Sequence, residues 1–334
     1  MKILVTKESS PEREIYFPQS VMERLGKIGE VTINTKNIPM TEEELKESIK
    51  DVDICVTHWA SPAFTEEVLK NANRLKLIAH AGSSVGNVTT DAVYSRGIKV
   101  ISGHKLTGRS LAEGALAYIL AALRYIPEQS NDMKNGFQWK NEKRVVNKGT
   151  LFEAKVGLIG LGVIGRTLLE LLGPFNAQIK VYDPYLADGQ LSGYSNVERA
   201  SLEEILRWGD IISLHASLTE ETKGMLNMDR LKLIRDGALL VNTARGAIID
   251  EDALISELGK NRFRAILDVY VKEPLDMDSP LRKMDNVILM PHAAGASNGN
   301  RSTNAIIDDM ERFVQGQPLQ LEISFERFKL MTRE

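Results

Sequence analysis

A glycine-rich segment between a predicted strand and a predicted helix constrains the fold of this chain more than any other feature. The apolar run Lys155–Ile159 leads into Gly160-Leu161-Gly162-Val163-Ile164-Gly165, and a helical pattern follows over Arg166–Leu172. The first glycine permits a tight turn, the second lets a pyrophosphate approach the backbone, and the third lets helix and strand pack closely. Free N–H groups at the helix N-terminus suit phosphate oxygens. The segment predicts a dinucleotide-binding unit, with a purely structural glycine turn as the alternative.

An acidic residue at the end of the next predicted strand indicates which dinucleotide binds. Asp183 follows the strand Gln178–Tyr182, about twenty residues after the glycine loop, where a carboxylate accepts hydrogen bonds from the adenosine ribose hydroxyls. It would repel a 2′-phosphate, and the adjoining Pro184 and Tyr185 supply no arginine to bind one. NAD is therefore predicted over NADP.

Short apolar runs alternate with helical stretches along the whole chain, which predicts an α/β protein with parallel sheets flanked by helices. The first series of predicted strands is Lys2–Val5, Val31–Ile33, Asp53–Val56, Leu75–Ala79 and Ile98–Ile101. The second series is Lys155–Ile159, Gln178–Tyr182, Asp210–Leu214, Ala238–Asn242, Arg264–Asp268 and Val287–Met290. Two doubly wound sheets are expected.

Three predicted helices bear on how the two sheets are connected. A capping box at Thr41–Glu44 begins one helix, and a second capping box at Ser110–Glu113 is expected to begin the helix Leu111–Leu123. That helix is apolar on nearly every side, so it is expected to lie between domains, between subunits, or in the core of one domain. The helix Asn304–Val314 comes too late to belong to the order of the second sheet.

The composition narrows the class of partner. A formal charge of -3 over 334 residues gives no attraction for nucleic acid, which favours small molecules or other subunits. No signal peptide or membrane-spanning run is found, so a cytoplasmic protein is expected. Cys55 lies in an apolar strand and is expected to be buried. Because no histidine pair has metal-ligand spacing beside an acid, no metal site is predicted.

Polar residues follow the predicted strands of the second sheet, at the edge where open α/β sheets bind ligands. These residues are Gly160, Asp183, His215, Thr243-Ala244-Arg245-Gly246, Asp268 and His292. The Arg245 guanidinium can bind a planar carboxylate at two points, with a solvated loop arginine as the alternative. Glu273 can reach the same edge, although taken alone it is better explained as a surface residue.

The combination of these segments closely resembles the D-isomer-specific 2-hydroxyacid dehydrogenase family. The resemblance rests on the glycine loop with Asp183, on "NTARG" with Arg245, on "LDVYVKEP" with Asp268 and Glu273, and on "PHAAG" with His292. It implies a flavodoxin-like substrate domain of residues 1–102 and 297–334 and a Rossmann NAD-binding domain of residues 103–296, joined by crossing helices. It also implies an active-site cleft between the domains and a homodimer formed through Leu111–Leu123.

The resemblance further implies the interconversion of a 2-keto acid and its D-2-hydroxy acid, with NAD as the hydride carrier. Arg245 would hold the substrate carboxylate, and His292, hydrogen-bonded to Glu273, would protonate the keto oxygen. Asp268 would meet the nicotinamide carboxamide. The other residues implied at the cofactor are Leu161, Val163, Ile164, Pro184, His215, Thr243 and Ala244, and those implied at the substrate are His58, Trp59, Gly82, Ser83 and Ser84, with His80 as a further candidate.

Departures from the family patterns bear on the substrate. The loop His58-Trp59-Ala60-Ser61-Pro62 has no fixed positive charge for a phosphate, which favours glyoxylate, hydroxypyruvate or a larger 2-keto acid. A D-3-phosphoglycerate dehydrogenase without a regulatory domain stays as an alternative. Ser83 and Glu273 argue against phosphite and formate dehydrogenases respectively, and Ser102-Gly103-His104-Lys105 has no explanation from the sequence. An NAD-sensing corepressor-like binding protein is the alternative from another class.

Overall fold

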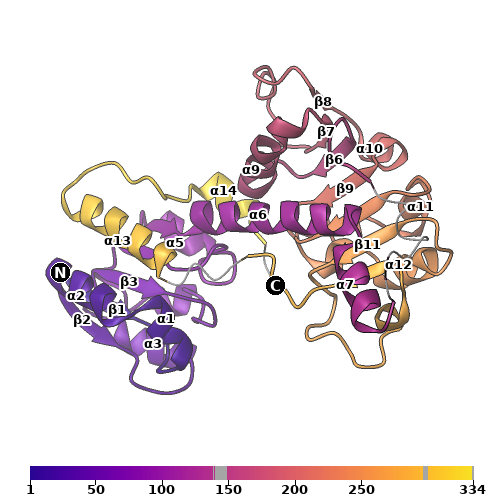
Figure 1. Ribbon diagram of the computed structural model, residues 1–334. Coiled ribbons are helices and arrows are strands. Elements are labelled where there is room, and N and C mark those ends of the chain that lie inside the picture. The colour runs from indigo at the N-terminus through magenta and orange to yellow at the C-terminus, as the bar shows by residue number, and fades with distance from the viewer. Residues whose placement is uncertain (138, 140–148, 296–299, 333–334) are drawn as a thin grey trace. The chain divides into compact units, whose positions relative to one another are not determined.

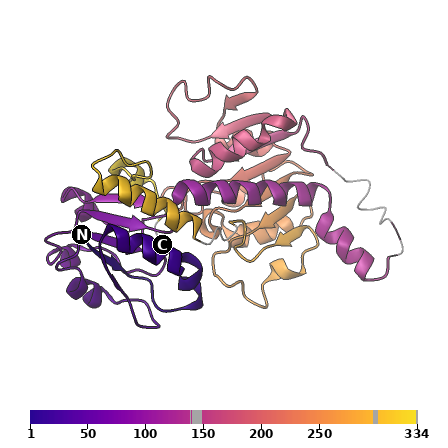
Figure 2. The same cartoon turned by 60° about the vertical axis from the view of Figure 1, so that its left-hand side comes forward.

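The computed structural model describes residues 1–137, 139, 149–295 and 300–332. The chain forms two compact units. Unit 1 comprises Met1–Gly108 with Ser297–Glu334, and unit 2 comprises Arg109–Ala296. Both units contain a parallel sheet with helices (Figures 1 and 2), so the predicted α/β class with two sheets is confirmed.

Unit 1 contains a five-stranded parallel sheet in the order β2-β1-β3-β4-β5. Its strands are β1 (Lys2–Val5), β2 (Glu30–Ile33), β3 (Ile54–Thr57), β4 (Leu77–His80) and β5 (Lys99–Ser102). Its helices are α1 (Pro11–Tyr16), α2 (Gln19–Ile28), α3 (Glu42–Ser48), α4 (Glu66–Leu69), α5 (Asp91–Ser95), α13 (Arg301–Val314) and α14 (Phe325–Lys329). The capping box predicted at Thr41 is confirmed, because its side chain accepts from Glu44 N–H while the Glu44 carboxylate accepts from Thr41 N–H.

The C-terminal helix α13 belongs to the core of unit 1. Its buried residues Ile306, Ile307 and Met310 join Val21 and Leu25 of α2 on one face of the five-stranded sheet. Figure 1 shows α13, in yellow, beside the indigo elements of the N-terminal segment. Its apolar face is therefore buried by residues nearly 300 positions earlier in the chain, as the long-range hydrogen bond from Arg24 to Asn304 also shows (|i−j| of 280).

Unit 2 contains a seven-stranded parallel sheet in the order β12-β11-β10-β9-β6-β7-β8. Its strands are β6 (Lys155–Ile159), β7 (Gln178–Tyr182), β8 (Val197–Arg199), β9 (Ile211–Leu214), β10 (Leu239–Asn242), β11 (Arg264–Leu267) and β12 (Val287–Leu289). Its helices are α7 (Ile126–Lys134), α9 (Val163–Leu172), α10 (Leu202–Trp208), α11 (Met228–Leu231) and α12 (Glu251–Leu258), with short 3-10 turns at Gly173–Phe175, Gly246–Ile248 and Pro280–Lys283. The edge strand β8 was not predicted, because a three-residue strand with two charged side chains lacks an apolar pattern.

The helix α6 (His104–Leu123) corrects one expectation from the sequence. It begins at His104, so Ser110 and Glu113 lie inside the helix and do not cap it. Within a single chain the helix is buried on one side, and its predicted place between domains or between subunits stays a prediction. Its small residues Ala112 and Ala115, with Ile119 and Ala122, pack into the core of unit 2, whereas Leu116, Leu120 and Leu123 on its other sides are only partly buried.

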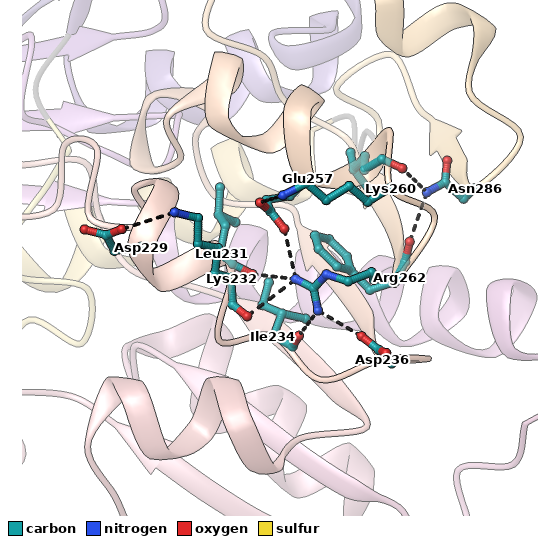
Figure 3. A network of polar contacts seen from close by, with 11 residues as sticks. Asp229, Leu231, Lys232, Ile234, Asp236, Glu257, Lys260, Arg262 and Asn286 are labelled. Atoms are coloured by element: carbon teal, nitrogen blue, oxygen red, sulfur yellow. Dashed lines mark hydrogen bonds and ion pairs between the residues drawn. The ribbon is translucent and has the colours of Figure 1, made fainter.

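A network of charged residues fixes the turn that leads into β11 (Figure 3). Glu257 is buried and accepts hydrogen bonds from Arg262 and Lys260, at 3.0 Å and 2.6 Å. Arg262 also donates to the Ile234 carbonyl at 2.8 Å and to Asp236 at 2.9 Å. The paired cations compensate the buried carboxylate, and the turn is thereby held against the segment before β10.

Candidate active site

The glycine loop of unit 2 has the close backbone approaches that its sequence predicts. Gly160 follows β6 with a φ of +94°, and a Cβ there would lie 2.6 Å from the Ala216 nitrogen. A Cβ at Gly165, in the first turn of α9, would lie 2.3 Å from the Gly160 carbonyl oxygen. Nothing lies within 4 Å of the position a Gly162 Cβ would take. The loop is therefore tight where it turns and open at its middle glycine.

Asp183 lies directly beside this loop. Its carboxylate accepts hydrogen bonds from the backbone N–H of Leu161 at 2.7 Å and of Tyr185 at 2.9 Å. Each carboxylate oxygen has further lone pairs, so these two bonds leave acceptor capacity for ribose hydroxyls. The contact to Leu161 fixes the carboxylate against the loop at the end of β7.

His215 and Thr243 follow β9 and β10 and are both buried. The His215 ring shares a hydrogen bond of 2.9 Å between its Nε2 and the Ser213 hydroxyl, and burial lowers the pKa of His215 to about 4. The His215 Nδ1 and the Thr243 hydroxyl have no hydrogen-bond partner within the part of the chain that the structure describes. Buried polar atoms of this kind are normally satisfied, so both are candidates for contact with a ligand.

The segment around His292 is held by Asp268, the first residue after β11. The Asp268 carboxylate is buried and accepts hydrogen bonds from Ala293 N–H at 2.8 Å and Ala294 N–H at 2.9 Å. The Asp268 carbonyl accepts from His292 N–H at 2.9 Å. Because His292 has a φ of +54°, a left-handed conformation that costs energy for a side chain with a Cβ, these three bonds help to stabilise it.

The imidazole of His292 is paired with a carboxylate at the rim of the sheet. Its Nδ1 lies 2.7 Å from Glu273 Oε2, and the other Glu273 oxygen accepts from Tyr270 N–H at 3.0 Å. The His292 side chain is 51% exposed and that of Glu273 37%. With Nδ1 bonded to the carboxylate, Nε2 is the nitrogen that can exchange a proton with another molecule.

Arg245 follows β10, the strand next to β11 in the sheet. The loop that carries Arg245 packs against the residues that follow β11. A Cβ at Gly246 would lie 2.0 Å from the Tyr270 carbonyl carbon, so only glycine permits this approach. The Arg245 backbone carbonyl accepts from the Asn242 side chain at 3.0 Å, and its guanidinium donates to the Ala244 carbonyl at 2.8 Å. The loop that carries Arg245 thus contacts the backbone that holds Glu273.

Two tyrosines at this site had no signal in the sequence. The Tyr118 hydroxyl of α6 donates to Asp268 at 3.3 Å, and burial together with this carboxylate raises the pKa of Tyr118 to about 12. The Tyr270 hydroxyl lies 3.0 Å from the Leu267 carbonyl and 2.8 Å from the Met290 carbonyl. Tyr270 therefore joins the ends of β11 and β12, from which Asp268 and His292 extend.

In unit 1, the predicted substrate residues cluster at the carboxyl ends of β3 and β4. A Cβ at Gly82 would lie 2.4 Å from His80 Nε2 and 3.2 Å from Trp59 Nε1. The fully buried His58 ring lies 4.4 Å from the rings of Tyr16 and Trp59. His58, Trp59 and Gly82 are thus close together, and Trp59 is partly exposed.

The imidazoles of this cluster are uncharged at neutral pH. Burial lowers the pKa of both His58 and His80 to about 3. The buried Lys7 acts electrostatically on His58 and is itself paired with Glu8 at 2.9 Å and Glu12 at 2.5 Å. The positive charge of Lys7 is therefore already compensated.

The segment Ser102-Gly103, which the sequence left unexplained, supports the loop that contains Ser83. The Ser102 hydroxyl donates to the Ser83 carbonyl at 3.0 Å, and Gly103 N–H lies 3.0 Å from the Gly82 carbonyl. Ser84 donates to the Thr332 carbonyl at 2.9 Å. These bonds fix the backbone of the loop from two other segments of unit 1.

Over the described ranges of the chain, no group of three or more His, Cys, Asp or Glu side chains could hold a metal ion. Within the same ranges, no helix combines the length and the apolar character needed to cross a membrane. Burial raises the pKa of the Cys55 thiol.

Comparison with known proteins gives a family match. The model of the D-isomer specific 2-hydroxyacid dehydrogenase, NAD binding domain, matches residues 116–294. D-3-phosphoglycerate dehydrogenase of Methanocaldococcus jannaschii is 34% identical over 298 residues, which are 88% of this chain and 55% of that protein. Hydroxypyruvate reductase of Thermotoga maritima is 32% identical over 85% of this chain and 92% of that protein. The chain thus spans about half the length of the first of these relatives.

Solved structures show the same architecture. D-lactate dehydrogenase from Aquifex aeolicus, complexed with NAD and lactic acid, has a TM-score of 0.73 at 26% identity and covers 94% of this chain and 96% of its own. A protein from Pyrococcus horikoshii OT3 has a TM-score of 0.81 at 24% identity and covers 98% of this chain and 96% of its own.

Proposed function

This chain belongs to the D-isomer specific 2-hydroxyacid dehydrogenase family, and on this premise we propose that it interconverts a small 2-keto acid and its D-2-hydroxy acid with NAD. The observation that carries the proposal is the His292–Glu273 pair, joined at 2.7 Å on an exposed rim. A partly exposed imidazole with a carboxylate partner is suited to general acid–base chemistry.

The residues of unit 2 fit the NAD that the family implies. The open position at Gly162 admits a pyrophosphate, and the Asp183 carboxylate is fixed beside the loop for the ribose. The unpartnered Thr243 hydroxyl and His215 Nδ1 are further candidates for contact. When bound, NAD supplies the carrier for the hydride.

The residues of the chain have separate tasks in this proposal. Arg245 binds the substrate carboxylate and polarises the keto oxygen, because a guanidinium matches a carboxylate at two points. His292 transfers a proton from Nε2 to the keto oxygen during reduction and takes it back during oxidation. Glu273 orients the imidazole through its contact with Nδ1. Asp268 holds the backbone that carries His292, and a contact of Asp268 with the nicotinamide carboxamide stays part of the proposal.

We propose that unit 1 is the substrate domain and unit 2 the NAD-binding domain. Trp59 and the Gly82-Ser83-Ser84 loop would then contact the substrate, while the fully buried His58, which the sequence also suggested as a substrate contact, packs behind Trp59. The uncharged imidazoles and the compensated Lys7 charge favour a substrate with an uncharged side chain, such as glyoxylate or hydroxypyruvate, over a phosphorylated one. The apolar face of Trp59 also suits a larger 2-keto acid.

The test is the oxidation of NADH in the presence of glyoxylate, hydroxypyruvate, phenylpyruvate and 3-phosphohydroxypyruvate. An unphosphorylated acid should have the largest kcat/KM, at least about tenfold above the phosphorylated one, and NADPH should replace NADH poorly. A preference for 3-phosphohydroxypyruvate would instead support the D-3-phosphoglycerate dehydrogenase alternative. If no acid is reduced although NAD binds, a corepressor-like binding protein becomes the better explanation.

A homodimer is a second proposal, because unit 2 exposes a group of large apolar side chains. No residue of α7 is buried, and Figure 2 shows this magenta helix reaching out from the rest of unit 2. The exposed apolar residues on and after α7 are Ile126, Met133, Phe137 and Trp139. Several large apolar side chains exposed on one short segment are typical of an interface. In analytical ultracentrifugation, the wild type should sediment as a dimer and Met133→Glu as a monomer.

A further inference from the structure

The amino edge of the sheet in unit 2 carries a hollow that the proposed function does not use. It has a volume of about 440 Å³ and is lined by Lys155, Ser201, Glu204, Arg207, Trp208 and Arg235. Lys155 begins β6, whereas Gly160 follows its end. At about 3.3 Å per residue, the length of β6 separates this hollow from the glycine loop at the opposite edge.

The carboxylates at the hollow are already compensated by cations of their own. Glu204 forms an ion pair with Lys180. Asp210 forms an ion pair with Arg235 and accepts a hydrogen bond from Lys155 N–H at 3.0 Å. The acids therefore contribute little unbalanced negative charge.

Two cations of the lining remain without such a partner. Among the residues that the structure describes, neither the Lys155 ammonium nor the Arg207 guanidinium forms an ion pair with a carboxylate. The Arg207 guanidinium donates a 3.4 Å hydrogen bond to the Glu203 carbonyl of its own helix, and it also interacts electrostatically with the Glu203 carboxylate, which forms its ion pair with Arg230. Like charges gathered in a concave surface raise the local concentration of anions, and a guanidinium beside an ammonium suits a phosphate or carboxylate.

The hollow also has an apolar, flat wall. The half-buried Trp208 ring has the Lys180 ammonium 5.1 Å from its centroid, and Lys180 is held there by Glu204. The Lys155 ammonium lies farther away, at 5.9 Å, near the limit of a cation–π contact. Lys155 can therefore turn toward an anion at little cost, while the indole contributes apolar contact area.

We propose that this hollow binds a small organic anion that carries a flat ring, with its phosphate or carboxylate between Lys155 and Arg207 and its ring against Trp208. The volume lies within the range of small-molecule sites. This site is separate from the proposed hydride transfer, and its occupancy does not depend on turnover.

Isothermal titration calorimetry on the full chain tests the proposal, with phenyl phosphate as the probe. The expected result is one site with a dissociation constant of about 0.1–1 mM, present equally without NAD and with saturating NAD. Phenol, which lacks the charge, and inorganic phosphate, which lacks the ring, should each bind at least about tenfold more weakly. Loss of the signal in saturating NAD would assign the binding to the dinucleotide site and overturn the proposal.

Variants separate the two recognition elements. Lys155→Met with Arg207→Gln should weaken phenyl phosphate binding at least about tenfold, and Trp208→Leu should weaken phenyl phosphate while leaving the weak binding of inorganic phosphate unchanged. Lys50→Met, which removes an exposed lysine of unit 1, is the matched control and should have no effect. Unchanged phenyl phosphate binding in the double variant, with an unchanged circular dichroism spectrum, would refute the site.

Discussion

Histidines follow parallel strands in both units of the chain, but their surroundings differ. In unit 1, His58 and His80 are buried at the ends of β3 and β4, and burial lowers the pKa of each to about 3. In unit 2, His292 follows β12 on an exposed rim with its Nδ1 2.7 Å from Glu273. The same residue type at the same kind of position is therefore an uncharged packing group in one unit and a candidate proton donor in the other.

The difference shows what a strand-end histidine needs for acid–base chemistry. His292 is accessible to another molecule and has a carboxylate partner. Within the described part of the chain, His58 has neither, because its ring is enclosed by Tyr16, Phe17 and Trp59. The comparison predicts that changes at His292 and Glu273 act on turnover, whereas a change at His58 acts first on stability.

The largest expected effect is that of His292→Ala. Removal of the proton donor should lower kcat for 2-keto acid reduction by about 10³-fold, within the range measured for general acids and bases. The affinity for NAD should not change, because the glycine loop and Asp183 are untouched. Steady-state kinetics and NADH titration measure the two quantities, and a near-normal kcat would remove His292 from the proposed mechanism.

Glu273→Gln should have the next largest effect. A hydrogen bond to a charged group contributes about 1.5–3 kcal/mol, so kcat should fall by about 10- to 100-fold with little change in NAD affinity. Glu251→Gln is the matched control, because Glu251 lies on the same rim and accepts from Val271 N–H at 3.2 Å. Equal losses in the two variants would mean that Glu273 supports the loop and not the imidazole.

His58→Phe should change the pH dependence of stability. The unfolded chain protonates His58 near pH 6.5, whereas the folded chain does so only near pH 3, so the wild type is destabilised as the pH falls through this window. Each such histidine changes the ratio of folded to unfolded protein by about tenfold per pH unit. Urea unfolding measures the free energy of unfolding at pH 7 and at pH 5. This free energy should decrease less between the two pH values in the variant than in the wild type, because the neighbouring Lys7 and Glu8 are the same in both proteins. An identical loss in both proteins would contradict the buried, uncharged assignment.

Tyr118→Phe should have the smallest effect. The variant keeps the ring but loses the 3.3 Å hydrogen bond to Asp268, which is worth about 1 kcal/mol, so kcat should fall a few-fold. Tyr94→Phe, in unit 1, serves as the control in the same kinetic assay. A loss as large as that of His292→Ala would indicate that Tyr118 takes part in proton transfer itself.

The sequence predicted most strands because their apolar runs are continuous, and β6, β7 and β11 are each followed directly by a glycine or an aspartate. The strands β1, β6 and β7 have the predicted bounds, and the family resemblance is confirmed. The start of α6 was wrong because Ser110-Leu111-Ala112-Glu113 fits a capping box equally well inside a helix. Only the backbone before Ser110, which is helical from His104, shows that these residues lie inside the helix and not at its start.

Some contacts of the candidate site could be predicted from the sequence, and others could not. The pairing of Glu273 with His292 followed from the resemblance, and the two atoms do meet in the structure; the roles of both residues stay predictions. The hydrogen bonds of Asp268 to Ala293 and Ala294 were not predictable, because they depend on the left-handed conformation of His292. Tyr118 was missed because its partner lies 150 residues away in the chain.

The bonds that hold His292 all come from a short stretch of the chain. Asp268, Tyr270 and Glu273 lie within six consecutive residues, and they contact residues 290–294 directly. The proposed acid–base pair and the bonds that hold it therefore belong to one local part of unit 2. If unit 1 is the substrate domain, as we propose, substitutions at Trp59 should change which acid is accepted and leave the His292–Glu273 pair intact.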